Sequence, residues 1–122
     1  MKKIILLCLL LVLNLALTSC DYEARITIQN KVHNATLEQV SWDGYSIAYS
    51  LMPGEKSNKH TIYGYKSSDF PKTSVVKFYM KRDGNQVYLE TKNAFTLNID
   101  DDLLIVISDT TEVVNPILQS DE

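Results

Sequence analysis

The sequence predicts an all-β protein whose main domain is a small antiparallel β-sandwich of about seven short strands. Two Asp-Gly pairs, Asp43-Gly44 and Asp83-Gly84, each stand between alternating segments, and such pairs favour the two-residue turns of β-hairpins. Short apolar–polar alternations recur along the chain with turn residues between them. After residue 20, no long segment has apolar residues at helical spacing. We therefore expect strands joined by short turns.

The first expected strand, residues 24–29, places Ile26 and Ile28 on one face. The first expected hairpin then joins residues 37–42 to residues 45–50. Counting outward from its turn gives three cross-strand pairs on the more apolar face: Trp42 with Tyr45, Val40 with Ile47 and Glu38 with Tyr49. The other face is small and polar, so the amphipathic pattern specifies the register.

The second expected hairpin joins residues 75–82 to residues 85–91. Counting from its turn gives apolar, aromatic and opposite-charge pairs in one register: Met80 with Val87, Phe78 with Leu89, Tyr79 with Tyr88 and Lys77 with Glu90. Such pairs contribute roughly 0.2–1 kcal/mol each. Because these independent signals agree, this hairpin is the most strongly specified part of the chain.

The remaining expected elements are short and are separated by turn or loop residues. They are a turn at 52–55, a strand at 60–63, a loop at 67–73, strands at 95–99 and 103–108, and a short edge strand at 112–114. We expect the sandwich domain to span residues 24–109 and a C-terminal tail to span residues 110–122.

The N-terminus has the organisation of a secretory leader. Lys2 and Lys3 precede residues 4–17, which are apolar except for Asn14 and are shorter than the roughly 20 residues of a membrane-spanning helix. The segment ends in Leu17-Thr18-Ser19-Cys20, which resembles the lipobox of bacterial lipoproteins. The resemblance implies cleavage by a signal peptidase of type II. Residues 1–19 would then be a signal peptide and residues 20–23 a lipidated anchor with a short tether.

A lipid on Cys20 would be the only non-protein group that we expect on this chain. Each acyl methylene buried in a bilayer contributes about 0.8 kcal/mol, so two or three chains hold a domain on a membrane. We therefore expect a membrane-anchored protein of the bacterial cell envelope, on the periplasmic face or the outer-membrane surface. The alternative is an ordinary secretory leader with a chance cysteine, but no Ala-x-Ala cleavage pattern ends this apolar stretch.

The charge and cysteine content restrict the partners of the processed chain. Loss of residues 1–19 removes two lysines and no acidic residue, which leaves ten basic against 15 acidic residues and a formal charge of −5. This acidity, without a basic patch, argues against nucleic acid or anionic lipid as a partner. Cys8 leaves with the leader and Cys20 is acylated, so no thiol remains for a disulfide.

A further resemblance involves the order of the elements within residues 26–62. A strand ending near Asn30, the turn Val40-Ser41-Trp42-Asp43-Gly44 and the segment Leu51-Met52-Pro53-Gly54-Glu55 resemble small β-sandwich lipoproteins of gut-type Gram-negative bacteria. This resemblance implies an immunoglobulin-like or transthyretin-like domain, in families that mostly have no known activity.

Residue patterns for catalysis are sparse. His33 and His60 are the only histidines, 27 positions apart, and no His-x-x-x-His, Cys-x-x-Cys or Gly-x-Ser-x-Gly pattern is present. Asp100 and Asp102, in the run Asp100-Asp101-Asp102, are the best candidate ligands for a metal such as calcium. The complete calcium-loop pattern is missing, so we expect a solvated turn, no bound metal and no enzymatic activity.

Aromatic residues are the remaining candidates for function. Trp42 and Tyr45 are expected in the core, whereas Tyr79 and Tyr88 share a strand face with charged residues, Lys77 and Glu90 among them. Tyrosine offers a large contact area at low entropic cost. We therefore expect a non-enzymatic binding or assembly module with a protein or glycan partner in the envelope. The alternatives are an inhibitor or immunity module against an envelope hydrolase, a glycan-binding accessory of a surface uptake system, or an enzyme that uses carboxylates or bound calcium.

Overall fold

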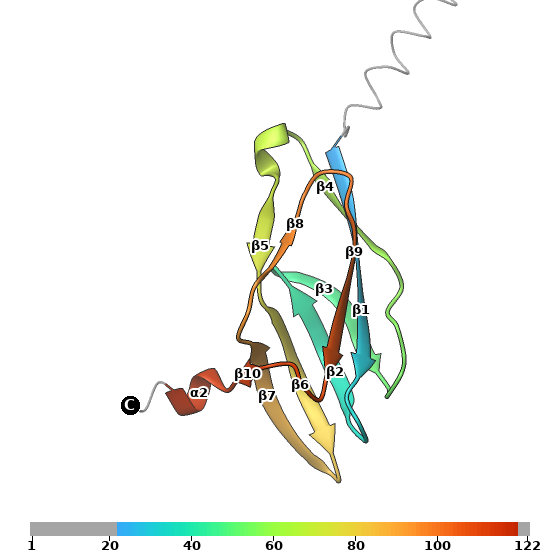
Figure 1. Ribbon diagram of the computed structural model, residues 1–122, viewed down its shortest axis with the longest axis vertical. Coiled ribbons are helices and arrows are strands. Elements are labelled where there is room, and N and C mark those ends of the chain that lie inside the picture. Colours follow the sequence, from blue (N-terminus) through green and yellow to red (C-terminus); the bar gives the residue numbers. More distant parts are fainter. Residues whose placement is uncertain (1–21, 120–122) are drawn as a thin grey trace, which may run out of the picture.

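The computed structural model describes residues 22–119 as a β-sandwich with a small third sheet (Figure 1). The three-stranded sheet has the order β4-β1-β9, with bounds Tyr22–Lys31 (β1), His60–Gly64 (β4) and Asp102–Ser108 (β9). The five-stranded sheet has the order β10-β7-β6-β2-β3, with bounds Thr36–Trp42 (β2), Tyr45–Leu51 (β3), Val76–Arg82 (β6), Asn85–Thr91 (β7) and Val113–Val114 (β10). β5 (Lys72–Ser74) and β8 (Phe95–Leu97) form the third sheet. Two short helices complete the described part, η1 (Ser67–Asp69) and α2 (Pro116–Gln119).

The core lies between the two larger sheets and is apolar. Ile26 and Ile28 of β1 are fully buried, as their alternation predicted, and they face Trp42 and Phe78 of the other sheet. Trp42 is fully buried as well, and its indole Nε1 donates a hydrogen bond of 2.9 Å to the carbonyl oxygen of Ser74. The predicted all-β sandwich is therefore confirmed.

The second hairpin has the predicted register throughout. β6 and β7 are antiparallel, with Tyr79 opposite Tyr88 and Lys77 opposite Glu90, and the two predicted apolar pairs are also present. Asp83 and Gly84 both have positive φ, as a type I′ turn requires. A tight turn and an amphipathic pattern that agree with each other leave a single register available.

In the first hairpin, only the pair next to the turn is as predicted. Trp42 is opposite Tyr45, but Val40 is opposite Ala48 rather than Ile47, because β3 contains one extra residue, a β-bulge. The predicted pair of Glu38 with Tyr49 is likewise wrong, since Glu38 is opposite Ser50. Beyond the bulge, Leu51 lies opposite Leu37 and is buried, whereas Tyr49, which was expected on the apolar face, is 79% exposed.

Two further features differ from the expected antiparallel sandwich. β1 pairs with β9 in parallel, because the turn after β8 returns the chain to the end of the molecule at which β1 also starts (Figure 1). β1 begins at Tyr22, two residues before the expected start of the domain. In the tail, the expected edge strand is present as β10, which pairs with β7.

Asn30, near the end of β1, is a fully buried polar residue that joins three segments. Its side-chain Nδ2 donates to the carbonyl oxygens of Ala35 (2.8 Å) and Leu51 (2.9 Å), and its Oδ1 accepts from the backbone N–H of Val32 (2.9 Å). The backbone of Asn30 also bonds the turn after β3, where Gly54 donates to its carbonyl oxygen. One side chain therefore connects the end of β1 to the start of β2 and the end of β3.

We predict that Asn30→Ala destabilises the domain strongly. The substitution leaves two buried carbonyl oxygens and one N–H without their partners, and each such loss costs about 1–3 kcal/mol, so the free energy of unfolding should fall by about 3 kcal/mol or more. Urea denaturation followed by circular dichroism measures this change. Gln29→Ala is the matched control, because the only side-chain hydrogen bond given for Gln29 in the described part is long (3.4 Å) and exposed. An equal loss in both variants would contradict the prediction.

Candidate functional site

The candidate site lies on the outer surface of the five-stranded sheet. Lys77 and Tyr79 of β6 point away from Phe78, which is buried in the core, and their partners on β7 are Glu90 and Tyr88. We call this group of Lys77, Tyr79, Tyr88 and Glu90 the tyrosine face. The structure brings together all four residues that the sequence indicated as a contact surface.

The two tyrosine rings of the tyrosine face lie side by side. Their centroids are 5.2 Å apart and their planes are tilted by 41°, within the usual range for an attractive aromatic pair. Both side chains are half-buried rather than freely exposed, because long charged neighbours surround them. The rings are therefore already ordered and retain part of their surface for contact.

Glu90 organises the polar edge of the tyrosine face. The Tyr88 hydroxyl donates a hydrogen bond of 3.0 Å to Glu90 Oε1, and the Lys77 ammonium lies 3.9 Å from the same oxygen. A second ion pair, between Lys81 and Glu38 at 4.0 Å, lies across the neighbouring strand pair. Exposed ion pairs of this length contribute little to stability, so they mainly position side chains. The face offers hydrogen-bonding groups of both charges next to two aromatic rings.

The environment of Tyr88 changes its acidity. Partial burial, together with the hydrogen bond to the Glu90 carboxylate, raises the pKa of Tyr88 above its ordinary value of 10.0. Both causes favour the neutral phenol, since burial and a nearby negative charge each disfavour the phenolate. Tyr88 is therefore a protonated hydrogen-bond donor at neutral pH.

In the acidic turn at Asp100-Asp101-Asp102, one carboxylate bonds the backbone and another bonds a lysine side chain. Asp100 adopts a φ of 65°, Asp101 Oδ2 accepts from the N–H of Asn98 at 2.8 Å, and Asp102 Oδ2 lies 2.7 Å from Lys59 Nζ. The hydrogen bond from Lys59 lowers the pKa of Asp102. Among residues 22–119, no group of three or more His, Cys, Asp or Glu side chains is arranged to hold a metal ion.

The two histidines occupy structural positions in different segments. His60 begins β4, opposite Ile26, and its ring lies 5.8 Å from that of Tyr45. His33 is in the turn after β1, where its carbonyl oxygen accepts from Arg82 at 2.7 Å and its N–H donates to Asp109 at 2.9 Å. The contacts of His33 are made by its backbone, and the contact of His60 is made by its ring.

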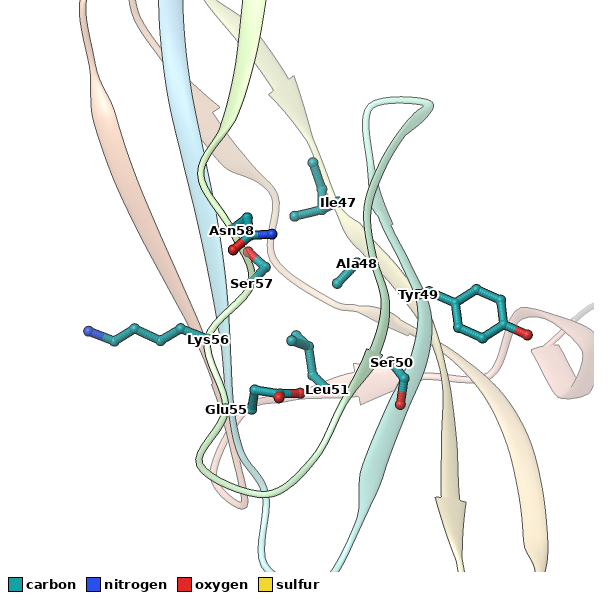
Figure 2. Close-up of a pocket in the computed structure, with 9 residues that line it drawn as sticks. All are labelled: Ile47, Ala48, Tyr49, Ser50, Leu51, Glu55, Lys56, Ser57 and Asn58. Atoms are coloured by element: carbon teal, nitrogen blue, oxygen red, sulfur yellow. The ribbon is translucent and has the colours of Figure 1, made fainter.

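An open groove of about 470 Å³ lies between β3 and residues 55–58 (Figure 2). Ile47 and Leu51 form its apolar wall, while Tyr49 and Lys56 point away from it. Of its polar lining residues, Ser57 holds the loop to β1, because its Oγ accepts from the N–H of Ile28 at 3.0 Å. The sequence predicted the turn at 52–55 but not this groove, which arises because the segment after the turn pairs back onto β1.

We predict that Glu90→Gln lowers the pKa of Tyr88 toward 10.0, because the substitution removes the negative charge that disfavours the phenolate. Because the pKa of Tyr88 is higher in the folded state than in the unfolded state, its protonation contributes stability at pH values below the unfolded-state pKa of Tyr88. That contribution is lost as the pH rises through the folded-state pKa of Tyr88. NMR titration of labelled tyrosine rings measures the shift. Glu38→Gln is the control, because the Glu38 carboxylate has the same exposed fraction, 23%, but pairs with Lys81. An unchanged Tyr88 pKa in Glu90→Gln would contradict the assignment.

Within residues 22–119, the structure contains no helix with the length and apolar character needed to cross a bilayer. A scan against protein-family models, a search of curated proteins and a search of solved structures each found no significant match.

Proposed function

We propose that this chain is a membrane-anchored lipoprotein of the bacterial cell envelope that binds a protein partner through the tyrosine face. The observation that carries the proposal is the register of β6 and β7, which places Tyr79 beside Tyr88 on the outer surface, next to the pair of Lys77 and Glu90. The anchor is the lipid expected on Cys20, on the periplasmic face or the outer-membrane surface.

The physical state of the two tyrosines favours binding. Association costs about 0.5–1.5 kcal/mol for each flexible side chain that must be ordered, and rings already held by strand pairing avoid much of that cost. Tyrosine is enriched among the residues that dominate interface energies, and its hydroxyl still finds hydrogen-bond partners. The tyrosine face therefore combines ordered aromatic surface with the charged groups that give specificity.

A protein partner is favoured over a glycan by the shape of the tyrosine face. The rings are tilted by 41° and half-buried, so together they form a ridged surface rather than a flat platform for a sugar ring. An inhibitor or immunity module against an envelope hydrolase is one form of this proposal. A glycan-binding accessory is the competing function, and the cross-linking experiment below separates the two.

The proposal that the protein is not an enzyme is supported by the positions of its acidic groups and histidines. Asp101 and Asp102 are used in a turn and an ion pair, and the two histidines belong to separate segments. The tyrosine face instead presents aromatic rings, a carboxylate and an ammonium group, which are groups suited to binding a partner.

Cross-linking in intact cells, followed by mass spectrometry of captured proteins, tests the partner proposal. The full-length chain should capture one abundant protein, and Tyr79→Ala with Tyr88→Ala should reduce that capture by about tenfold or more, as loss of central aromatic contacts does. The control is Leu104→Ala, which removes an exposed apolar side chain from β9, in the other large sheet. Capture that is unchanged in the Tyr79 and Tyr88 variant would contradict the proposal. Loss of bound oligosaccharide instead of protein would favour the glycan accessory.

The anchor is tested by Cys20→Ala. Without the thiol, no diacylglyceryl group can be attached, so we expect the chain to keep residues 1–19 or to be released from the membrane without lipid. Intact-mass spectrometry of membrane and soluble fractions measures both changes. Cys8→Ala is the matched control, since it removes the other cysteine of the leader and should leave lipidation intact. Membrane retention of Cys20→Ala with no change in mass would contradict the lipoprotein proposal.

A further inference from the structure

The start of β1 defines one end of the sandwich, which we call the anchor end. There, Tyr22 and Glu23 of β1 pair with Gly64 and Tyr63 of β4, and the carbonyl oxygen of Glu23 accepts from the N–H of Asp100 at 2.8 Å. Figure 1 shows the start of β1, the end of β4, η1 and the turn between β8 and β9 together at this end. The anchor end is therefore built from segments that are far apart in the sequence.

The lipidation proposed at Cys20 lies only two positions before the first residue of β1. An extended chain spans at most about 3.6 Å per residue, so the Cα atoms of Cys20 and Tyr22 are at most about 7 Å apart. The acyl chains of such a cysteine are in the bilayer and its backbone is at the level of the headgroups. This spacing leaves no room for a tether, and the anchor end must lie against the membrane surface.

The anchor end carries two of the most exposed aromatic side chains in the described part of the chain. Tyr63 is 57% exposed and Tyr65 is 79% exposed. Because Tyr63 is opposite Glu23, its ring is beside the second residue of β1. Tyrosine is enriched at membrane–water interfaces, since its ring prefers the apolar side of the headgroup region and its hydroxyl prefers water.

Tyr65 is held on an ordered turn rather than on a loose loop. Asp69 Oδ2 accepts from the N–H groups of Lys66 (3.0 Å) and Tyr65 (2.8 Å), and these bonds lower the pKa of Asp69. Phe70 is 6% exposed and packs against Gly64 so closely that a Cβ there would lie 2.8 Å from its ring. The turn is fixed from both sides, while the Tyr65 ring remains in solvent.

We propose that Tyr63 and Tyr65 contact the headgroup region of the bilayer, so that the anchor end sits directly on the membrane. This inference rests on the lipidation proposed for Cys20. The contact is aromatic rather than electrostatic, because the charges at the anchor end are mixed: the acidic Glu23 and Asp100 lie there together with Lys66. It therefore requires no anionic lipid and is insensitive to salt.

The test uses the full-length lipidated chain reconstituted into phosphatidylethanolamine and phosphatidylcholine vesicles whose acyl chains are brominated near the headgroup. Tyr65→Trp introduces a reporter at the anchor end, and Tyr49→Trp is the control. Both native side chains are 79% exposed. Tyr49 lies near the other end of β1, because it is two residues from Leu51, whose carbonyl oxygen accepts from Asn30. Asn30 is eight strand steps from Tyr22, which is about 26 Å. The buried Trp42 gives the same background in both variants.

We expect brominated lipid to remove roughly half of the added emission in Tyr65→Trp and little of it in Tyr49→Trp, because the quencher acts only near the bilayer surface. The quenching should persist in 0.5 M salt and without anionic lipid. If mass spectrometry shows that the chain is lipidated and the two variants are quenched equally, the proposed membrane contact is overturned. The proposed lipidation of Cys20 would then still stand. Quenching that needs anionic lipid and disappears with salt would also overturn it. A chain that carries no lipid would overturn both proposals.

Discussion

The sandwich depends on a buried amide. Asn30 lies where β1 ends, β2 begins and β3 ends. Its side chain donates to the carbonyl oxygens of Ala35 and Leu51 and accepts from the N–H of Val32, so it bonds all three backbone segments. An apolar residue of the same size would fill the space but would leave two carbonyl oxygens and an N–H without partners. The apolar core is non-directional, so it holds the sheets together without fixing how they are connected. Asn30 supplies that directional constraint in a domain whose described part contains no disulfide.

The second hairpin was predictable because every signal needed to specify it is local. The Asp83-Gly84 turn, the alternation and the cross-strand pairs all lie within residues 75–91, and the structure has each of them. The first hairpin has an equally clear turn, yet its register was wrong from Val40 outward. The extra residue in β3 is favoured by the burial of Leu51 beside Leu37. That contact depends on where β1 lies, which no local pattern contains.

The same distinction between local and distant information applies to the sites. Tyr79 and Tyr88 could be placed together from sequence because they are nine positions apart across one turn. The sequence identifies Tyr63 and Tyr65 as aromatic residues but does not predict which part of the fold they lie beside. Their position beside the start of β1 follows from an antiparallel pairing between residues about 40 positions apart. The parallel pairing of β1 with β9 also joins distant segments, and alternation alone cannot give a strand its direction.

The direction of the strands has a consequence for the partner. In Figure 1 the long strands of both large sheets lie roughly along the long axis, and β1 starts at one end of that axis. A chain seated by that end would hold its sheets upright, and the tyrosine face would look sideways along the membrane rather than outward from it. A protein that diffuses in the same bilayer would meet this surface in two dimensions and at a fixed height. Such confinement raises the effective concentration of the partner, so a modest intrinsic affinity would be sufficient for the complex to form.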